Sequence, residues 1–251
     1  MHRRPPAGEE GGQCVGAEEA TGRERCMENI PKNLQSVRDR IAAACDRADR
    51  DPGGVTLVAV TKTVGGDEIR RLYDLGVRDF GENRVQEGLD HAALLGQADA
   101  RWHFIGHLQR NKAAAALAMF RRIHSVESPK LINVLDKECG ILGYRAEIML
   151  EVNVSREESK YGIAPGGAVE LTEKALSADN LSLFGLMTMA PFTADPETVR
   201  PVFRGLRELR DRLADRFPVA PLELSMGMSG DFEVAIEEGA TIVRVGGALF
   251  E

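Results

Sequence analysis

Residues 55–84 read VTLVAVTKTVGGDEIRRLYDLGVRDFGENR and contain one complete repeat of strand, helix and strand. The run 55–60 is apolar and β-branched, as a buried parallel strand requires, and 67–76 has the spacing of an amphipathic helix. A second short strand-like run, 77–81, then leads into polar residues. The stretch therefore predicts a parallel β–α–β unit, from which α/β sheets and barrels are built.

The same alternation continues to the end of the chain. Eight strand-like runs occur in total, at 55–60, 77–81, 101–106, 121–126, 146–154, 182–189, 222–228 and 241–246. Helical patterns separate them, and a further helix is expected at 31–48, before the first strand. Eight repeats favour a single (β/α)8 barrel. The alternative, a doubly wound Rossmann-like sheet, lacks a G-x-G-x-x-G motif after the first strand.

Composition excludes several classes of protein. The chain has 251 residues, 43% of them hydrophobic, and a net charge of −7 with its lysines and arginines dispersed, so a nucleic-acid surface is not expected. The four cysteines show no C-x-x-C spacing, which argues against a zinc site or a disulfide framework and fits a reducing cytoplasm. No apolar run approaches the roughly 20 residues of a membrane span.

The domain organisation predicted from the sequence is simple. Residues 1–27 are rich in Gly, Glu and Pro and have no apolar signal segment, so we expect a disordered extension. Residues 28–251 show no linker and are expected to form the one barrel domain. The partner of such a domain is expected to be a small molecule, with no nucleic acid and no membrane.

Functional residues of (β/α)8 barrels gather at the carboxyl ends of the strands. Lys62 follows the apolar run 57–60 after one intervening threonine, so its amine is expected to project into the partly desolvated barrel mouth, where a lysine can act as a Schiff-base nucleophile. The alternative is an ordinary lysine that extends into solvent. The residues alone leave both open.

The ends of the last two strands have the composition of a phosphate-binding site. Gly246 and Gly247 permit close backbone approach, and the hydroxyl of Ser229 can donate a hydrogen bond. The alternatives are a plain turn at the glycines and a helix N-cap at the serine.

Arg244 lies within an apolar strand, where a buried guanidinium needs a partner. A pyridine nitrogen would serve, and an arginine there would leave the ring unprotonated and weaken it as an electron sink. A salt bridge to Glu151 or Glu223 is the alternative. His103 and His107 are four residues apart, but on a strand that spacing does not place them on one face, so no metal site is inferred.

Seven segments together resemble the pyridoxal phosphate homeostasis protein family, over nearly the whole chain after Met27. They are VAVTK (58–62), FGENRVQE (80–87), WHFIGHLQRNK (102–112), NVSREESKYG (153–162), GLMTM (185–189), LSMGMS (224–229) and VRVGGALF (243–250). The resemblance implies a barrel like the amino-terminal domain of alanine racemase, with pyridoxal 5'-phosphate (PLP) as cofactor.

The resemblance also implies roles for individual residues. Lys62 would form the Schiff base, and Arg244 would face the pyridine nitrogen. Ser229 and the backbone at Gly246 and Gly247 would hold the phosphate. The remaining pocket residues implied by the resemblance are Asn83, Met187, Asn153 and His103. One departure concerns Gly247, because many family members have threonine or serine there, so a hydroxyl contact to the phosphate is lost and affinity is expected to fall.

The expected function is handling of PLP rather than catalysis with it. Alanine racemases use a tyrosine from a second domain of a partner subunit, and this chain has no such domain. Its tyrosines are Tyr73, Tyr144 and Tyr161. The resemblance implies a monomer that stores, delivers or buffers PLP, with PLP-dependent apoenzymes as partners. A weak amino-acid racemase, a Schiff-base aldolase and a purely structural barrel are the alternatives.

Overall fold

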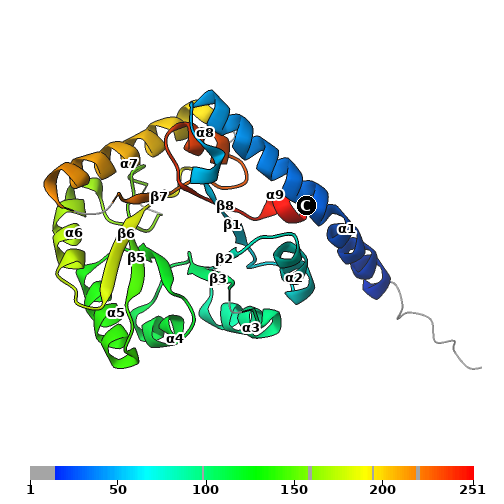
Figure 1. Cartoon of the computed structure of the whole chain (residues 1–251), viewed down its shortest axis with the longest axis horizontal. Helices are drawn as coiled ribbons and strands as arrows, with labels where there is room; N and C mark the ends of the chain where they lie inside the picture. The colour runs from blue at the N-terminus through cyan, green and yellow to red at the C-terminus, as the bar shows by residue number, and fades with distance from the viewer. Residues whose placement is uncertain (1–14, 98, 158–159, 194, 219–220) are drawn as a thin grey trace, which may run out of the picture.

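The computed structural model describes residues 15–97, 99–157, 160–193, 195–218 and 221–251, the side chains from Cys26 onward. Parallel strands form a closed barrel in the order of the chain, and helices surround it (Figure 1). The strands are β1 (Thr56–Val60), β2 (Asp79–Glu82), β3 (Arg101–Phe104), β4 (Arg122–Val126), β5 (Ala146–Glu151), β6 (Leu181–Met187), β7 (Glu223–Ser225) and β8 (Ile242–Val245). The expected (β/α)8 barrel is confirmed.

The helices also follow the expected order. They are α1 (Val15–Arg47), α2 (Gly66–Asp74), α3 (Val85–Leu95), α4 (Ala113–Leu117), α5 (Pro129–Leu142), α6 (Ala168–Leu176), α7 (Pro196–Arg216), α8 (Phe232–Glu237) and α9 (Gly247–Phe250). Short 3-10 turns lie at Pro52–Gly54, Arg110–Lys112 and Pro165–Gly167. Because every strand pairs in parallel with the next, all eight carboxyl ends meet at one end of the barrel.

Two apolar layers hold the barrel together. The large outer layer lies between strands and helices and includes Ala59 and Phe80. A small inner cluster fills part of the barrel interior, with Val58, Met149, Met187 and Ile242 as its fully buried members. Along β1 and β5, successive side chains alternate between the two layers, as they do in a packed barrel core.

Helix α1 lies along α8 and α9 on the outside of the barrel (Figure 1). Its apolar face buries Ile30, Leu34, Val37 and Ile41, at a spacing of three to four residues. Arg40 forms an ion pair with Glu233 of α8 at 2.8 Å. The helix therefore packs against the two short helices that follow β7 and β8.

The start of this helix differs from the sequence prediction. The sequence predicts a helix from Pro31 to Ala48, after a disordered segment 1–27. In the structure α1 begins at Val15 and Pro31 lies inside it. Residues 15–27 are therefore helical, and residues 1–14 lie outside the described residues.

Candidate functional site

The carboxyl ends of β1 and β8 lie side by side. Val58 pairs with Arg244 and Ala59 with Val245, so the chain after each strand leaves the barrel at the same place. A methyl group on Gly246 would stand 3.3 Å from the carbonyl oxygen of Val60. Glycine therefore allows the two strand ends to approach closely.

Lys62 is exposed at this end of the barrel. Lys62 lies in the short turn that follows β1, where the N–H of Val64 donates to the carbonyl oxygen of Thr61. Within the described residues, its amine has no hydrogen-bond or ion-pair partner. An amine in this position is available to a ligand in the barrel mouth.

A polar cluster behind Lys62 fixes the end of β1. The side chain of Thr61 is fully buried and donates a hydrogen bond to Oε1 of Glu82, at the end of β2. The same oxygen lies 2.8 Å from Nδ1 of His91 on α3. The other oxygen of Glu82 is buried and has no partner among the described residues. Sequence reasoning missed Glu82 and His91, because only the fold shows that they lie behind Lys62.

The ends of β7 and β8 form a small cradle of hydrogen-bonding groups. The backbone N–H groups of Gly246 and Ala248 donate to Oγ of Ser229 at 3.2 and 3.3 Å. These N–H groups are engaged with Ser229 in the structure, and an anion that replaced this contact would meet a hydroxyl and two N–H donors at one place. Gly247 lies between the two donors, at the start of α9. The segments singled out in the sequence are thus brought together.

Gly227 is required for the turn that leads from β7 to Ser229. Its φ of +94° lies in the left-handed region, and a Cβ there would stand 2.7 Å from the Cβ of Ala235. Its carbonyl oxygen accepts a hydrogen bond from the backbone N–H of Arg244 at 3.0 Å. The turn therefore sets the position of Ser229 relative to β8.

Arg244 is buried at the floor of the mouth. Its Nη1 donates to Oγ of Ser225 at 2.6 Å, and its Nη2 donates to the carbonyl oxygen of Thr188 at 3.0 Å. Burial lowers the pKa of this guanidinium to about 10, while the negative charges of Glu151 and Asp231 oppose the shift. Arg244 thus forms no direct salt bridge with Glu151, although that carboxylate attracts it.

Two buried acids near Arg244 were not singled out by sequence reasoning as site residues. Burial, reinforced by the negative charge of Glu127, raises the pKa of Glu151 to about 7, and Arg244 partly offsets the effect. Burial also raises the pKa of Asp231, whose carboxylate accepts a hydrogen bond from the N–H of Met228. Their proximity to Arg244 depends on contacts between distant strands, which no local pattern reveals.

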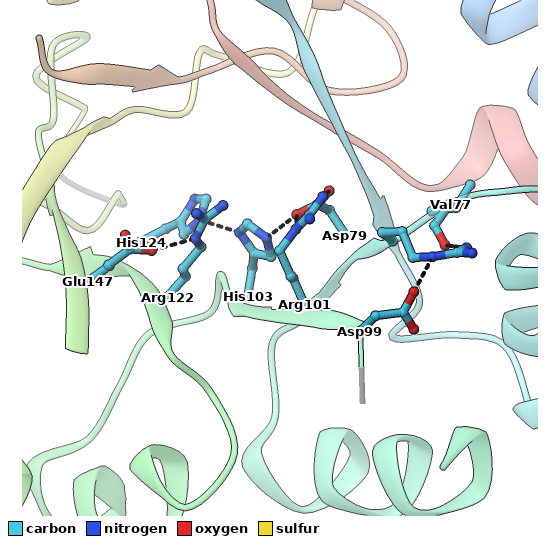
Figure 2. Close-up of polar contacts among 9 residues, drawn as sticks. Val77, Asp79, Asp99, Arg101, His103, Arg122, His124 and Glu147 are labelled. Atoms are coloured by element: carbon cyan, nitrogen blue, oxygen red, sulfur yellow. Dashed lines mark hydrogen bonds and ion pairs between the residues drawn. The ribbon is translucent and has the colours of Figure 1, made fainter. Parts of the chain in front are cut away.

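His103 and Met187 lie inside the barrel. Both ring nitrogens of His103 are engaged, Nε2 with Asp79 at 3.0 Å and Nδ1 with His124 at 2.9 Å (Figure 2). No ring nitrogen of His103 is left for a ligand, so we do not retain it as a direct pocket contact. Met187 is 1% exposed and belongs to the inner apolar cluster.

Asn83 and Asn153 lie in loops at the mouth. Asn83 follows β2, and a side chain at Gly106 would collide with its carbonyl oxygen at 2.4 Å, so glycine there lets the two loops pack together. The amide of Asn153 donates to the carbonyl oxygens of Glu157 and Lys160, at 2.8 and 3.3 Å. Asn153 thus shapes its own loop.

The loop after β5 is attached to both sides of the mouth. The ring of Tyr161 stacks on that of His107, with centroids 4.2 Å apart, and the N–H of Gly162 donates to Glu127 at 2.9 Å. On the other side, Nζ of Lys160 donates to the carbonyl oxygen of Ala190. The loop therefore connects the ends of β3 and β4 to the segment after β6.

Comparison with known proteins supplies the family. The family model for the alanine racemase N-terminal domain matches residues 32–251. The pyridoxal phosphate homeostasis protein of Aquifex aeolicus is 45% identical over 222 residues, which cover 88% of this chain and 97% of the relative. The chain belongs to the pyridoxal phosphate homeostasis protein family.

Solved structures extend this relationship to three dimensions. A protein of Bifidobacterium adolescentis, described as unknown, superposes with a TM-score of 0.85 at 38% identity, covering 90% of this chain and 96% of its own. PipY of Synechococcus elongatus, solved with PLP bound, gives 0.78 at 35% identity and covers 88% of this chain and 100% of its own. These two proteins thus share this barrel along nearly their whole lengths.

Other kinds of site are absent from the described part of the chain. Cys26, Cys45 and Cys139 are free thiols there, whereas Cys14 lies outside the described residues. No group of His, Cys, Asp or Glu residues in the described ranges could hold a metal ion. In the same ranges, no helix is long and apolar enough to cross a membrane.

Proposed function

We propose that this protein binds PLP as a Schiff base on Lys62 and stores, delivers or buffers the cofactor. The observation that carries the proposal is the cradle of Ser229, Gly246 and Ala248, beside a buried Arg244 and next to the strand end that carries Lys62. The cradle matches the phosphate of PLP, the buried Arg244 matches its pyridine nitrogen, and the amine of Lys62 matches its aldehyde.

The residues present fit this cofactor in detail. The hydroxyl of Ser229 and the amide N–H groups around Gly246 and Gly247 would hold the phosphate. Arg244 would face the pyridine nitrogen as a hydrogen-bond donor, which leaves that nitrogen unprotonated. Asn83 and Met187 would line the pocket. When bound, PLP supplies an aldehyde that condenses with a primary amine, and Lys62 has the free amine for this reaction.

The relatives support the same assignment. Curated relatives bear the name pyridoxal phosphate homeostasis protein, and PipY was solved with PLP bound at 35% identity to this chain. The departure at Gly247 removes a side-chain hydroxyl from the cradle, so the phosphate would rely more on Ser229 and the backbone.

We further propose that the protein does not catalyse a reaction with the cofactor. Racemisation needs a second base on the face of the cofactor opposite the lysine. Tyr73 bonds to Asp99 and Tyr144 to the carbonyl oxygen of Leu117, both away from the mouth. Tyr161 lies at the mouth, but it is 53% exposed and stacked on His107. An open mouth of this kind gives little protection to a carbanion, which favours a carrier.

The cellular role follows from these properties as a proposal. The protein would act as a monomer in the cytoplasm and pass PLP to PLP-dependent apoenzymes. Weak amino-acid racemisation is the second candidate, because the Tyr161 hydroxyl is at the correct end of the barrel. A Schiff-base aldolase would need no role for Arg244, whose burial at the floor of the mouth argues against it.

Transfer and proton exchange separate the carrier from the racemase. The protein is loaded with PLP, freed of excess cofactor and mixed with a PLP-dependent enzyme stripped of its own cofactor. We expect recovery of that enzyme's activity, and no recovery with a Lys62→Ala variant treated identically. In a second experiment, L-alanine is incubated with the loaded protein in deuterated water. If the α-proton signal is lost faster than with free PLP, the racemase hypothesis is favoured over the carrier hypothesis.

A further inference from the structure

A continuous chain of hydrogen bonds crosses the barrel interior, and the proposed function does not use it. We call it the interior chain; its members are Asp79, His103, His124, Ser225 and Arg244. Successive contacts measure 3.0 Å from Asp79 Oδ1 to His103 Nε2, 2.9 Å from His103 Nδ1 to His124 Nε2, 2.8 Å from His124 Nδ1 to Ser225 Oγ and 2.6 Å from Ser225 Oγ to Arg244 Nη1. Each member is buried.

The two ends of the interior chain lie at opposite ends of the barrel. Asp79 is the first residue of β2, at the amino end, where Arg101 forms a two-pronged ion pair with it at 2.7 and 2.5 Å (Figure 2). Arg244 lies at the floor of the mouth. The chain therefore connects the far end of the barrel to the residue that would face the pyridine nitrogen.

The chemistry of the two ends fixes the direction of every hydrogen bond between them. A guanidinium can only donate, so Ser225 accepts from Arg244, and the Asp79 carboxylate can only accept. With both rings neutral, the second requirement leaves Nδ1 of His124 as the acceptor of the Ser225 proton. His124 then carries its proton on Nε2 and donates to Nδ1 of His103. His103 in turn carries its proton on Nε2 and donates to the Asp79 carboxylate. Each ring nitrogen is used once, as donor or acceptor, and Arg244 keeps further N–H donors for a ligand.

The charges around the two imidazoles favour this neutral arrangement. Burial lowers the pKa of both rings; the hydrogen bond and the charge of Asp79 oppose the shift at His103, whereas the positive charges of Arg244 and Arg122 reinforce it at His124. Arg122 is paired with Glu147 at 2.6 Å, and Arg101 is paired with Asp79. Because these two arginines are already neutralised by carboxylates, a proton added to either imidazole would be an unpaired buried positive charge.

We propose that the interior chain locks Arg244 in one orientation as a donor toward the cofactor pocket, with His103 and His124 as neutral Nε2–H tautomers. His103, His124 and Ser225 are then positioning residues that act through Arg244. This role rests on the proposed function. The tautomers themselves follow from the hydrogen-bond geometry and do not depend on any cofactor.

Nitrogen-15 NMR of the cofactor-free protein tests the tautomers directly. Long-range correlations between ring protons and nitrogens distinguish Nε2–H, Nδ1–H and imidazolium forms. At pH 7.5 we expect His103 and His124 to be neutral, each with its proton on Nε2. A proton on Nδ1 of either ring, or an imidazolium at either position, would overturn the interior chain.

Removal of the Ser225 hydroxyl tests the positioning role. Ser225→Ala breaks the link between Arg244 and His124, and Ser125→Ala is the matched control, because Ser125 is also buried and its hydroxyl has no hydrogen-bond partner among the described residues. A hydrogen bond to a charged group is worth enough to change an equilibrium about tenfold or more. We expect about tenfold weaker PLP binding and an altered pH profile of the bound chromophore for Ser225→Ala, with both unchanged for Ser125→Ala.

The outcomes separate the two proposals. Wild-type affinity and an unchanged pH profile in Ser225→Ala would overturn the positioning role while leaving PLP binding intact. Because a merely structural hydroxyl would lower stability without moving the pH profile, stability is measured in parallel by urea unfolding. If the wild-type protein binds no PLP, the proposed function fails and so does the cofactor part of this inference, whereas the tautomers are still decided by NMR.

Discussion

Replacement of Glu151 by glutamine should stabilise the cofactor-free protein, and the gain should depend on pH. The structure raises the pKa of this carboxyl from 4.5 to about 7, through burial and the charge of Glu127. In the unfolded chain the carboxyl regains its ordinary pKa. Between these values the folded state binds more protons than the unfolded state, so the protein loses stability as pH rises through 7.

The size of the effect follows from the shift. At pH 8 an ionised Glu151 costs about 3 kcal/mol of folding free energy, since each pKa unit corresponds to about 1.4 kcal/mol. At pH 5 the cost is under about 1 kcal/mol, because the folded protein keeps the proton. Glutamine has the shape of the protonated acid and no titration. The stability gained by Glu151→Gln should therefore be larger at pH 8 than at pH 5 by about 2.5 kcal/mol.

Urea unfolding at the two pH values measures this difference. Free energies of unfolding of the wild type and Glu151→Gln are compared at pH 5 and pH 8, by linear extrapolation. Glu208→Gln is the control, because Glu208 is an exposed acid on α7. The same stability change at both pH values in Glu151→Gln would refute the conclusion that Glu151 is held protonated by its surroundings.

Ser229→Ala removes the hydroxyl from the phosphate cradle and should weaken PLP binding about tenfold, as measured by absorbance titration; unchanged affinity would exclude Ser229 from the site. Gly227→Ala should lower the free energy of unfolding by more than about 2 kcal/mol, because its φ is +94° and a methyl group would stand 2.7 Å from a neighbouring atom. In the Glu151→Gln background, acidification from pH 7 to 5 should destabilise the protein. Because the pKa values of His103 and His124 are lowered in the folded protein, both rings take up protons more readily in the unfolded chain. Below the unfolded pKa of about 6.5, each ring therefore lowers the free energy of unfolding by up to about 1.4 kcal/mol per pH unit. Stability that rises on acidification, in the same unfolding assay, would contradict the buried neutral histidines.

The barrel could be predicted from local sequence patterns, because each strand position is marked by a short run of residues in the sequence itself. The expected strands are short runs bounded by polar residues or glycine, and all eight overlap an observed strand. The expected run 146–154 extends past Glu151, where β5 ends, because Val152 and Val154 continue its pattern. The prediction that α1 begins at Pro31 was wrong, because the helix begins at Val15 and contains Pro31 in its interior. A proline is common in the first turn of a helix and occurs less often inside one.

The interior of the barrel could not be predicted in the same way. His124 and Ser225 are 101 residues apart and meet only because β4 and β7 enclose the same space. His103 was associated with the pocket by resemblance, yet its neighbours Asp79 and His124 come from strands whose register no local pattern gives. The segments around Ser229 and Gly246 were recognised in advance because the residue types themselves suggest phosphate binding.

The measurement that tests the central claim most directly is chemical trapping of PLP on this protein. PLP is added to the purified protein, the near-visible absorption spectrum is recorded, and the mixture is reduced with borohydride, digested and mapped by mass spectrometry. The account predicts a near-visible band, a phosphopyridoxyl group on the peptide that contains Lys62, and loss of both in Lys62→Ala. Absence of the band in the wild type, or a label on another lysine such as Lys160, would contradict the account.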